Sequence, residues 1–206
     1  MPMHKVFISY HHDNDQWAKD ALVEWNDANQ VFVDRSVDSG DISDDLSDDA
    51  IRVKIRDEYL RDSTVTILLV GKETANRKHI DWELYSSMRD SAKNKKSGIV
   101  VILLPSVCGE KHHVHAGHGQ DEKNLYPSIT SWTHISSRDD IKWGGYEYLP
   151  ERIVDNLLAT DAKISVTTWK DICEDSTRLI KLIEMAHLGR AECEYDLSRP
   201  MRRKNS

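Results

Sequence analysis

Apolar residues along the first half of the chain form short, nearly continuous runs that alternate with segments of helical spacing. These runs are 6–10, 31–33, 65–70 and 99–104. Between them, in 17–25, 46–59 and 80–88, apolar residues recur every three or four positions, as on the buried face of a helix. Short buried strands that alternate with helices are typical of an open parallel sheet. We therefore predict an α/β fold with an open parallel sheet and helices on both faces.

The pattern loses its regularity after Pro105, where a loop with glycine and histidine precedes an aromatic segment. A helix at 150–158, an edge strand at 164–166 and a helix through 179–186 are predicted beyond it. We interpret the aromatic residues as packing rather than as a base-stacking or partner surface; they are Tyr126, Trp132, Trp143, Tyr146 and Tyr148. No repeat or linker marks a second domain. We expect one domain over 1–195, with its core at 4–105, an irregular C-terminal elaboration at 106–195 and a basic disordered tail at 196–206.

The composition is that of an ordinary soluble protein of 206 residues, with 39% hydrophobic and 31% charged residues. A formal net charge of −7 disfavours nucleic acid, and no apolar run approaches the roughly 18 residues that span a bilayer. The N-terminal segment lacks the apolar core of a secretory signal, and three cysteines without a CxxC pair suit a reducing compartment. We therefore expect a cytoplasmic protein with neither a nucleic-acid nor a membrane partner.

Ligands of open parallel sheets bind beyond the carboxyl ends of the strands. The loops that begin at Tyr10, Asp34 and Gly71 should therefore meet at one edge of the sheet. The chain has no GxGxxG after its first strand and no GxxxxGK[ST] anywhere, which excludes Rossmann dinucleotide binding and P-loop phosphate binding. A receiver domain that is phosphorylated would resemble its family in two features: paired acidic residues after the first strand and an aspartate at the end of the third strand. This chain lacks acidic residues at those positions.

A single carboxylate, Glu83, lies about one turn into the predicted third helix, at the rim formed by these loops. One carboxylate can suffice to cleave an N-glycosidic bond to a pyridinium, because nicotinamide leaves as a neutral molecule. The carboxylate would bind the ribose hydroxyls and stabilise the positive charge that develops at the anomeric carbon. The alternative is that Glu83 is an acidic residue that stabilises a helix N-terminus.

Two other groups of polar residues were weighed as ligand sites. A zinc site formed by Cys108, His112, His113, His115 and His118 is disfavoured, because their spacing fits no standard structural site. The acidic segment 34–49 lacks the ligand spacing of a calcium loop and is expected to be exposed. We therefore predict no metal.

The histidines that follow the first strand leave two interpretations open. His11 and His12 could assist proton transfer in the pocket, because an imidazole titrates near neutrality, or they could be polar loop residues.

Four segments resemble, in order and spacing, the successive boxes of TIR domains. They are Val6-Phe7-Ile8-Ser9-Tyr10, Val31-Phe32-Val33-Asp34, 63–70 and Ile80-Asp81-Trp82-Glu83-Leu84. The resemblance covers residues 4–105 and is greatest to the TIR-like proteins, called ThsB, of the Thoeris anti-phage system. Each motif is weak alone, but four motifs in register are fairly specific.

The resemblance implies a flavodoxin-like fold and an enzyme that cleaves NAD as its substrate without a further cofactor. The family's catalytic glutamate falls on Glu83. Its nucleotide pocket falls on Ser9, Tyr10 and His11, with Asp34 also shaping the pocket. The resemblance further implies self-association through the loop 34–45, an ADP-ribose-derived product that activates an effector protein, and a phage protein as a candidate trigger.

The chain departs from the family at one position. Many TIR enzymes carry Trp four residues before the glutamate, where this chain has His79, and its Trp82 would point about 100 degrees away on the helix. His79 would replace the missing ring in the substrate pocket, or it marks a weakened site. A weakened site keeps a non-catalytic TIR-like interaction module open as an alternative to an NAD-cleaving enzyme. A nucleoside-processing transferase on the same sheet is a separate alternative.

Overall fold

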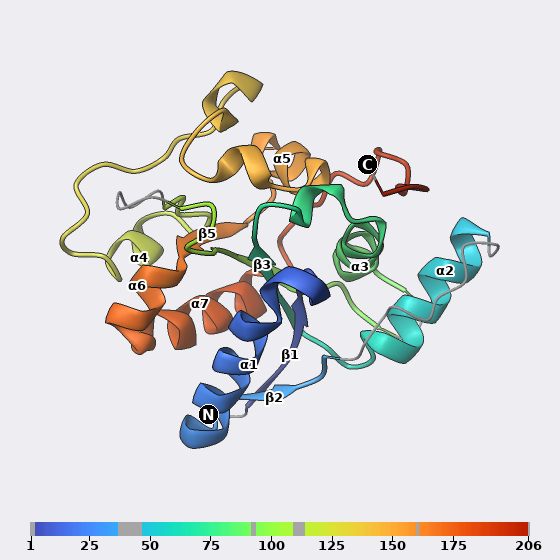
Figure 1. Ribbon diagram of the computed structural model, residues 1–206, viewed down its shortest axis with the longest axis horizontal. Helices are drawn as coiled ribbons and strands as arrows, with labels where there is room; N and C mark the ends of the chain where they lie inside the picture. The colour runs from blue at the N-terminus through green and yellow to red at the C-terminus, as the bar shows by residue number, and fades with distance from the viewer. Residues whose placement is uncertain (1–2, 37–46, 92–93, 109–113, 160, 206) are drawn as a thin grey trace.

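A parallel sheet of five strands forms the centre of the structure, a computed structural model that describes residues 3–36, 47–91, 94–108, 114–159 and 161–205. The strands are β1 (His4–Ser9), β2 (Phe32–Asp34), β3 (Val65–Val70), β4 (Gly98–Leu103) and β5 (Ser165–Thr168). They lie in the order β2-β1-β3-β4-β5, and every pair of neighbours is parallel (Figure 1). The predicted α/β fold, with an open parallel sheet of flavodoxin-like order and an edge strand near 165, is confirmed.

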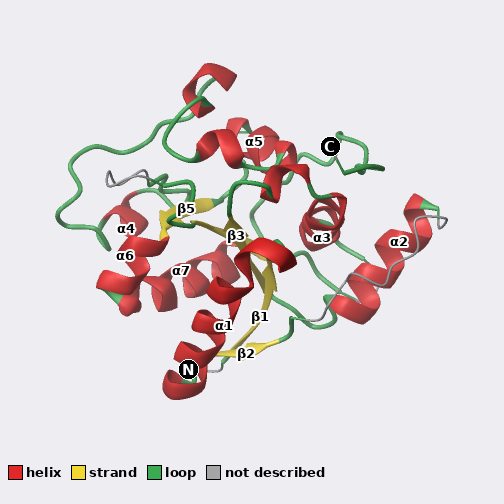
Figure 2. Ribbon diagram, in the orientation of Figure 1, coloured by secondary structure: helices red, strands yellow, loops and turns green. Residues whose placement is uncertain are grey.

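Helices cover both faces of the sheet (Figure 2). One face carries α1 (His12–Asn29), α6 (Trp169–Glu174) and α7 (Ser176–Gly189). The other carries α2 (Asp48–Lys54), which continues as π-helix η1 (Ile55–Tyr59), together with α3 (Lys78–Met88) and α5 (Glu151–Leu158). Every residue of β3 and β4 is buried, because both strands have a strand on each side and helices above and below.

Alternation along β1 decides what each face of the sheet presents. Val6, Ile8 and Tyr10 pack in an apolar cluster with α1 and α7. Phe7 packs on the opposite face in a cluster with η1 and Trp82 of α3. Successive side chains of a strand point to opposite faces, so Ser9 follows Phe7 toward α3. The alternation thus directs the last residue of β1 toward the helix that carries Glu83.

The described part of the segment between β4 and β5 is mostly loop (Figure 2). Its short elements are α4 (Gln120–Lys123) and the 3-10 turns η3 (Arg138–Ile141) and η4 (Tyr146–Tyr148), and a further 3-10 turn, η2 (Thr74–Asn76), follows β3. Tyr126 and Tyr146 are buried, whereas Trp143 is exposed. No helix in the described parts of the chain has the length and apolarity required to cross a bilayer.

The C-terminal segment differs from the expected disordered tail. Residues 196–205 pack against α5 and α3. On α3, the Trp82 indole nitrogen donates a hydrogen bond to the backbone oxygen of Arg202 (2.7 Å). The backbone nitrogen of Arg202 donates to the Asp81 carboxylate (2.8 Å), and the Met201 side chain is buried in the same cluster as Phe7. The basic residues suggested a solvated tail, but hydrogen bonds of backbone polar groups and the buried side chain of Met201 anchor the segment.

Candidate active site

Glu83 and Ser9 meet at the carboxyl end of β1. The Ser9 hydroxyl donates a hydrogen bond of 2.6 Å to Glu83 Oε2, and both side chains are buried, with Glu83 only 3% exposed. A short hydrogen bond to a carboxylate is a strong one and defines the orientation of the acceptor. The structure therefore joins two predicted site residues that lie 74 positions apart in the sequence.

The orientation of Glu83 depends on how α3 is held. Ile80, Leu84 and Met88 bury one side of the helix in the apolar cluster of β3, β4 and α5. The buried Arg152 guanidinium donates to both carboxylate oxygens of Asp81, at 2.8 and 3.1 Å. A bidentate pair of this kind adds directional specificity to apolar packing. The helix is therefore anchored on either side of the position that Glu83 occupies.

His11 begins α1 as its N-cap residue and is buried. Its Nδ1 accepts a hydrogen bond from the backbone nitrogen of Asn14 (3.3 Å), so in the neutral ring the proton lies on Nε2. Nε2 lies 3.5 Å from Glu73 Oε2, beyond the range of a normal hydrogen bond. The capping role thus leaves His11 with a single outward N–H donor.

Asp15 is a buried carboxyl group that the sequence analysis did not single out. It is 4% exposed and lies over Gly71, the residue that follows β3. A Cβ at Gly71 would stand 2.4 and 2.5 Å from the two carboxylate oxygens, so only glycine permits this approach. Burial raises the pKa of Asp15, the nearby His11 lowers it, and the negative Glu73 raises it. The sequence shows only an acidic residue in the first turn of a helix and, separately, a glycine at the end of a strand. Helix-end and turn preferences explain both residues without a functional role.

Tyr10 and Asp34 form hydrogen bonds with residues other than Glu83, the partner of Ser9. Tyr10 lies on the α1 face of the sheet, where its hydroxyl donates to the side-chain oxygen of Gln16 (2.7 Å). The Asp34 carboxylate accepts bonds from the backbone and the hydroxyl of Ser36, whose hydroxyl oxygen in turn accepts from the backbone nitrogen of Ile8. Asp34 thus shapes the loop after β2, and Tyr10 faces away from α3.

His79 lies on α3 one turn before Glu83 and is half-buried. Its ring contacts the Trp82 ring edge-on, with centroids 5.0 Å apart. The imidazole and the indole, which fall on different sides of the helix in a simple projection, are therefore in contact. Most of the predicted self-association loop lies outside the described residues, since only 34–36 of 34–45 are described.

The histidine-containing loop gives no metal centre in the parts of the chain that the structure describes. His112 and His113 fall outside those parts. His115 Nδ1 lies 3.2 Å from the backbone oxygen of Thr133, and burial raises the pKa of the Cys108 thiol, which disfavours the thiolate that a metal needs. No three of the described histidine, cysteine and acidic side chains gather closely enough to hold an ion.

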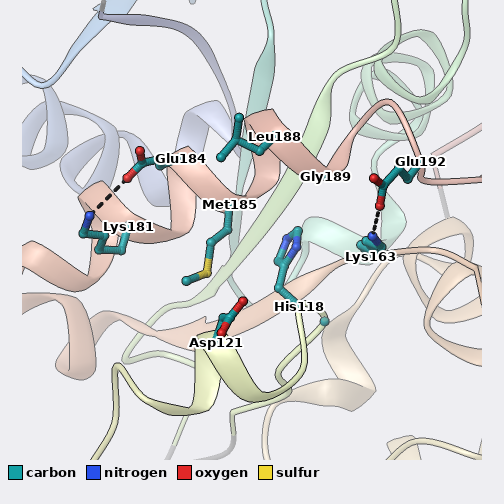
Figure 3. A pocket seen from close by; sticks show the side chains of 10 residues that line it. His118, Asp121, Lys163, Lys181, Glu184, Met185, Leu188, Gly189 and Glu192 are labelled. Atoms are coloured by element: carbon teal, nitrogen blue, oxygen red, sulfur yellow. Dashed lines mark hydrogen bonds and ion pairs between the residues drawn. The ribbon is translucent and has the colours of Figure 1, made fainter. Parts of the chain in front are cut away.

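A cavity of about 510 Å³ lies at the other end of the sheet (Figure 3). The end of α7 forms one wall, and His118 and Lys163, which precedes β5, line it. Its rim carries two ion pairs, Lys163 with Glu192 at 2.6 Å and Lys181 with Glu184 at 3.2 Å. Burial, and then the positive Lys163, lower the pKa of His118 to about 4, so the ring is neutral. Each lysine of this cavity is thus paired with a glutamate, and Asp121 is a further acidic residue of the lining.

Comparison with known protein families identifies a family for the first half of the chain. Residues 7–108 match the family model described as Thoeris protein ThsB, TIR-like domain. Among solved structures, the activated Roq1 resistosome directly recognizing the pathogen effector XopQ (TIR domains) is similar at 10% sequence identity, with 95% of this chain and 89% of that chain covered and a TM-score of 0.35. No curated protein matches the chain significantly. The matched segment holds the second half of β1, β2 to β4, α3 and both members of the Ser9–Glu83 pair. Residues 7–108 are a TIR-like domain of the Thoeris ThsB family.

Proposed function

We propose that this protein cleaves the bond between nicotinamide and ribose in NAD, with Glu83 as the catalytic carboxylate. The observation that carries the proposal is the buried Ser9–Glu83 hydrogen bond at the carboxyl ends of the strands, within the ThsB-like segment. Ligands of open parallel sheets bind at this end, where the strand order reverses between β1 and β3. The position of Glu83 at this end of the sheet supports the proposal.

The chemistry requires a negative charge that is held in place. When the glycosidic bond breaks, its electron pair moves onto the pyridinium nitrogen and positive charge develops on the ribose. A carboxylate in a buried site stabilises that charge more than it would in water, provided that its orientation is set beforehand. Ser9 sets the orientation of Glu83, and the Asp81–Arg152 pair holds the helix.

The remaining predicted site residues have supporting roles in this proposal. The His11 Nε2–H would donate a hydrogen bond within the pocket, and His79 would contact the nicotinamide or ribose from the turn before Glu83. Tyr10 and Asp34 would shape the pocket through α1 and through the loop after β2. Ser9 would share the Glu83 carboxylate with the ribose hydroxyls.

The product and partners are proposed from the family alone. We propose a cytoplasmic enzyme of bacterial anti-phage immunity that self-associates through the loop 34–45 and responds to a phage protein. Its ADP-ribose-derived product would activate an effector protein.

A second candidate, a non-catalytic interaction module, is favoured by the burial of Glu83. A carboxylate that is 3% exposed and hydrogen-bonded to a serine can also serve only to join α3 to β1. In that case Glu83→Gln would retain biological activity, because an amide oxygen still accepts the bond from Ser9.

The test is mass spectrometry of nucleotides in cells that express the full chain, with and without phage challenge. Glu83→Gln is expected to lower NAD consumption by about a thousandfold or more, because it removes the negative charge that stabilises the transition state. Glu24→Gln, the same change at an exposed position of α1, is the matched control and should retain activity. Unchanged nucleotides in challenged cells that survive would contradict the enzyme and favour the interaction module.

A further inference from the structure

A second carboxyl group lies at the same strand ends as Glu83. Asp15 comes from α1 and Glu83 from α3, on opposite faces of the sheet, and both approach the switch point between β1 and β3. Asp15 covers Gly71 at the end of β3, while Ser9 joins Glu83 to the end of β1. The two carboxyl groups therefore lie at the same end of the sheet, one on each of its faces.

Asp15 and His11 each present a polar atom that the folded chain does not satisfy. Asp15 Oδ2 and His11 Nε2 are both buried and have no hydrogen-bond partner among the described residues. An unsatisfied buried donor or acceptor costs about 1–3 kcal/mol, and such atoms in native structures call for an explanation. His11 also lies close enough to act electrostatically on Asp15. The pair thus offers an N–H donor beside a carboxylate acceptor.

A donor beside an acceptor is complementary to a hydroxyl group, which accepts one hydrogen bond and donates another. The proposed reaction needs such a group after nicotinamide has left, because the ribose must then be attacked by an oxygen that carries a proton. If Glu83 took that proton, it would lose the negative charge that stabilises the ribose. The chemistry therefore leaves a role for a second carboxylate.

We propose, on the basis of the proposed function, that Asp15 is the general base of the second half-reaction and that His11 orients the attacking hydroxyl of water or of another acceptor. The carbon–nitrogen bond breaks and its electron pair leaves with nicotinamide. A lone pair of the hydroxyl oxygen then forms the bond to the anomeric carbon, the O–H electron pair stays on oxygen, and the proton moves to Asp15. The site is thus specific for acceptors that carry a hydroxyl group.

The surroundings of Asp15 suit a base. Burial raises its pKa, which increases its affinity for a proton above that of an exposed aspartate, and Glu73 acts in the same direction. His11 opposes them, and Arg77, which pairs with Glu73, moderates the charge of Glu73. These charged groups come from the N-cap of α1 and from the connection between β3 and α3.

The decisive experiment compares two acceptors of the ribosyl group, water and free nicotinamide. The full chain is assayed in lysates of phage-challenged cells. Water carries a proton that must be removed, whereas free nicotinamide attacks through a ring nitrogen that has no proton to lose. Hydrolysis is measured as ADP-ribose formation, and exchange as incorporation of isotopically labelled nicotinamide into NAD. Asp15→Asn keeps the shape of the side chain, and Asp13→Asn, an exposed acid in the same helical turn, is the matched control.

We expect Asp15→Asn to lower hydrolysis by about a hundredfold and exchange by less than about threefold, the difference that general-base catalysis predicts. Glu83→Gln should lose both reactions and Asp13→Asn neither. Equal loss of both reactions in Asp15→Asn, or loss of neither, would overturn the role of Asp15. Wild-type protein that performs neither reaction would contradict the proposed function itself.

Discussion

The strand-end site and the His118 cavity differ in both size and chemistry. The cavity measures about 510 Å³ and opens to solvent beside α7, yet its lysines and glutamates are paired and its histidine is held neutral. The strand-end site is buried; it pairs Ser9 with Glu83 and places His11 near Asp15. Among the described residues, His11 Nε2 and Asp15 Oδ2 have no hydrogen-bond partner. His118 Nε2 of the cavity likewise has no hydrogen-bond partner among the described residues, so the buried carboxyl groups of Glu83 and Asp15, rather than volume, distinguish the candidate active site.

The buried group beneath the cavity should affect stability rather than catalysis. Glu122 accepts hydrogen bonds from the backbone of His118 (3.0 Å) and the hydroxyl of Ser165 (2.8 Å). Burial outweighs these bonds and raises the pKa of Glu122 from 4.5 to about 7. The folded protein therefore binds this proton more tightly than the unfolded chain does.

The largest expected effect is a loss of stability with rising pH, because the folded protein and the unfolded chain differ in their affinity for the Glu122 proton. The contribution of Glu122 is fully present below pH 4.5 and is lost as the pH rises through about 7. It corresponds to about 3 kcal/mol of unfolding free energy. Chemical denaturation of wild type and Glu122→Gln between pH 4.5 and 8 measures it. We expect the wild type to lose more stability than the variant over this range, and parallel curves would contradict the titration.

A smaller effect is expected at the strand-end site from Ser9→Ala. The change removes a hydrogen bond to a charged group, worth about 1.5–3 kcal/mol, so NAD cleavage should fall by about tenfold to a hundredfold. Ser86→Ala is the matched control, because it removes a buried hydroxyl of α3 that has no hydrogen-bond partner among the described residues. Similar cleavage rates for Ser9→Ala and wild type would show that the bond does not orient Glu83.

The smallest effect is expected at the cavity rim. Glu184→Gln breaks the ion pair with Lys181, and such solvent-exposed pairs contribute about 0–1 kcal/mol. The free energy of unfolding and the rate of NAD cleavage should both stay close to wild type, as measured by denaturation and nucleotide analysis. A strong loss of cleavage would assign the cavity, and not only the strand ends, to the active site.

Some residues of the candidate site could be predicted from the sequence and others could not. Glu83 could be singled out because one carboxylate stands a turn into the helix that follows a buried strand, and the family resemblance added Ser9. The roles proposed for Tyr10, His11, Asp34 and His79 remain predictions. Asp15 could not be singled out, because its importance depends on contact with Gly71, 56 positions later, and an acid in a first helical turn is common for other reasons.

The C-terminal segment shows the same limit of sequence reasoning. Its basic residues indicated a solvated tail, while the bonds that hold it connect Arg202 to Asp81 and Trp82, about 120 positions away. Charge is visible in a sequence, but the partner of a backbone group is not. The packing of this segment on α3 therefore became apparent only in the structure.

Local pattern alone determined the alternation of strands and helices, the edge at which their loops meet and the position of Glu83 on that edge. Hydrophobic period encodes which face of each element is buried, so these features need no knowledge of distant contacts. The tertiary structure decided which side chains meet at the edge: Ser9 with Glu83, Asp15 over Gly71, and the C-terminal segment against α3. These contacts join residues far apart in the chain, and their distances follow from how the helices pack on the sheet, which no local pattern specifies.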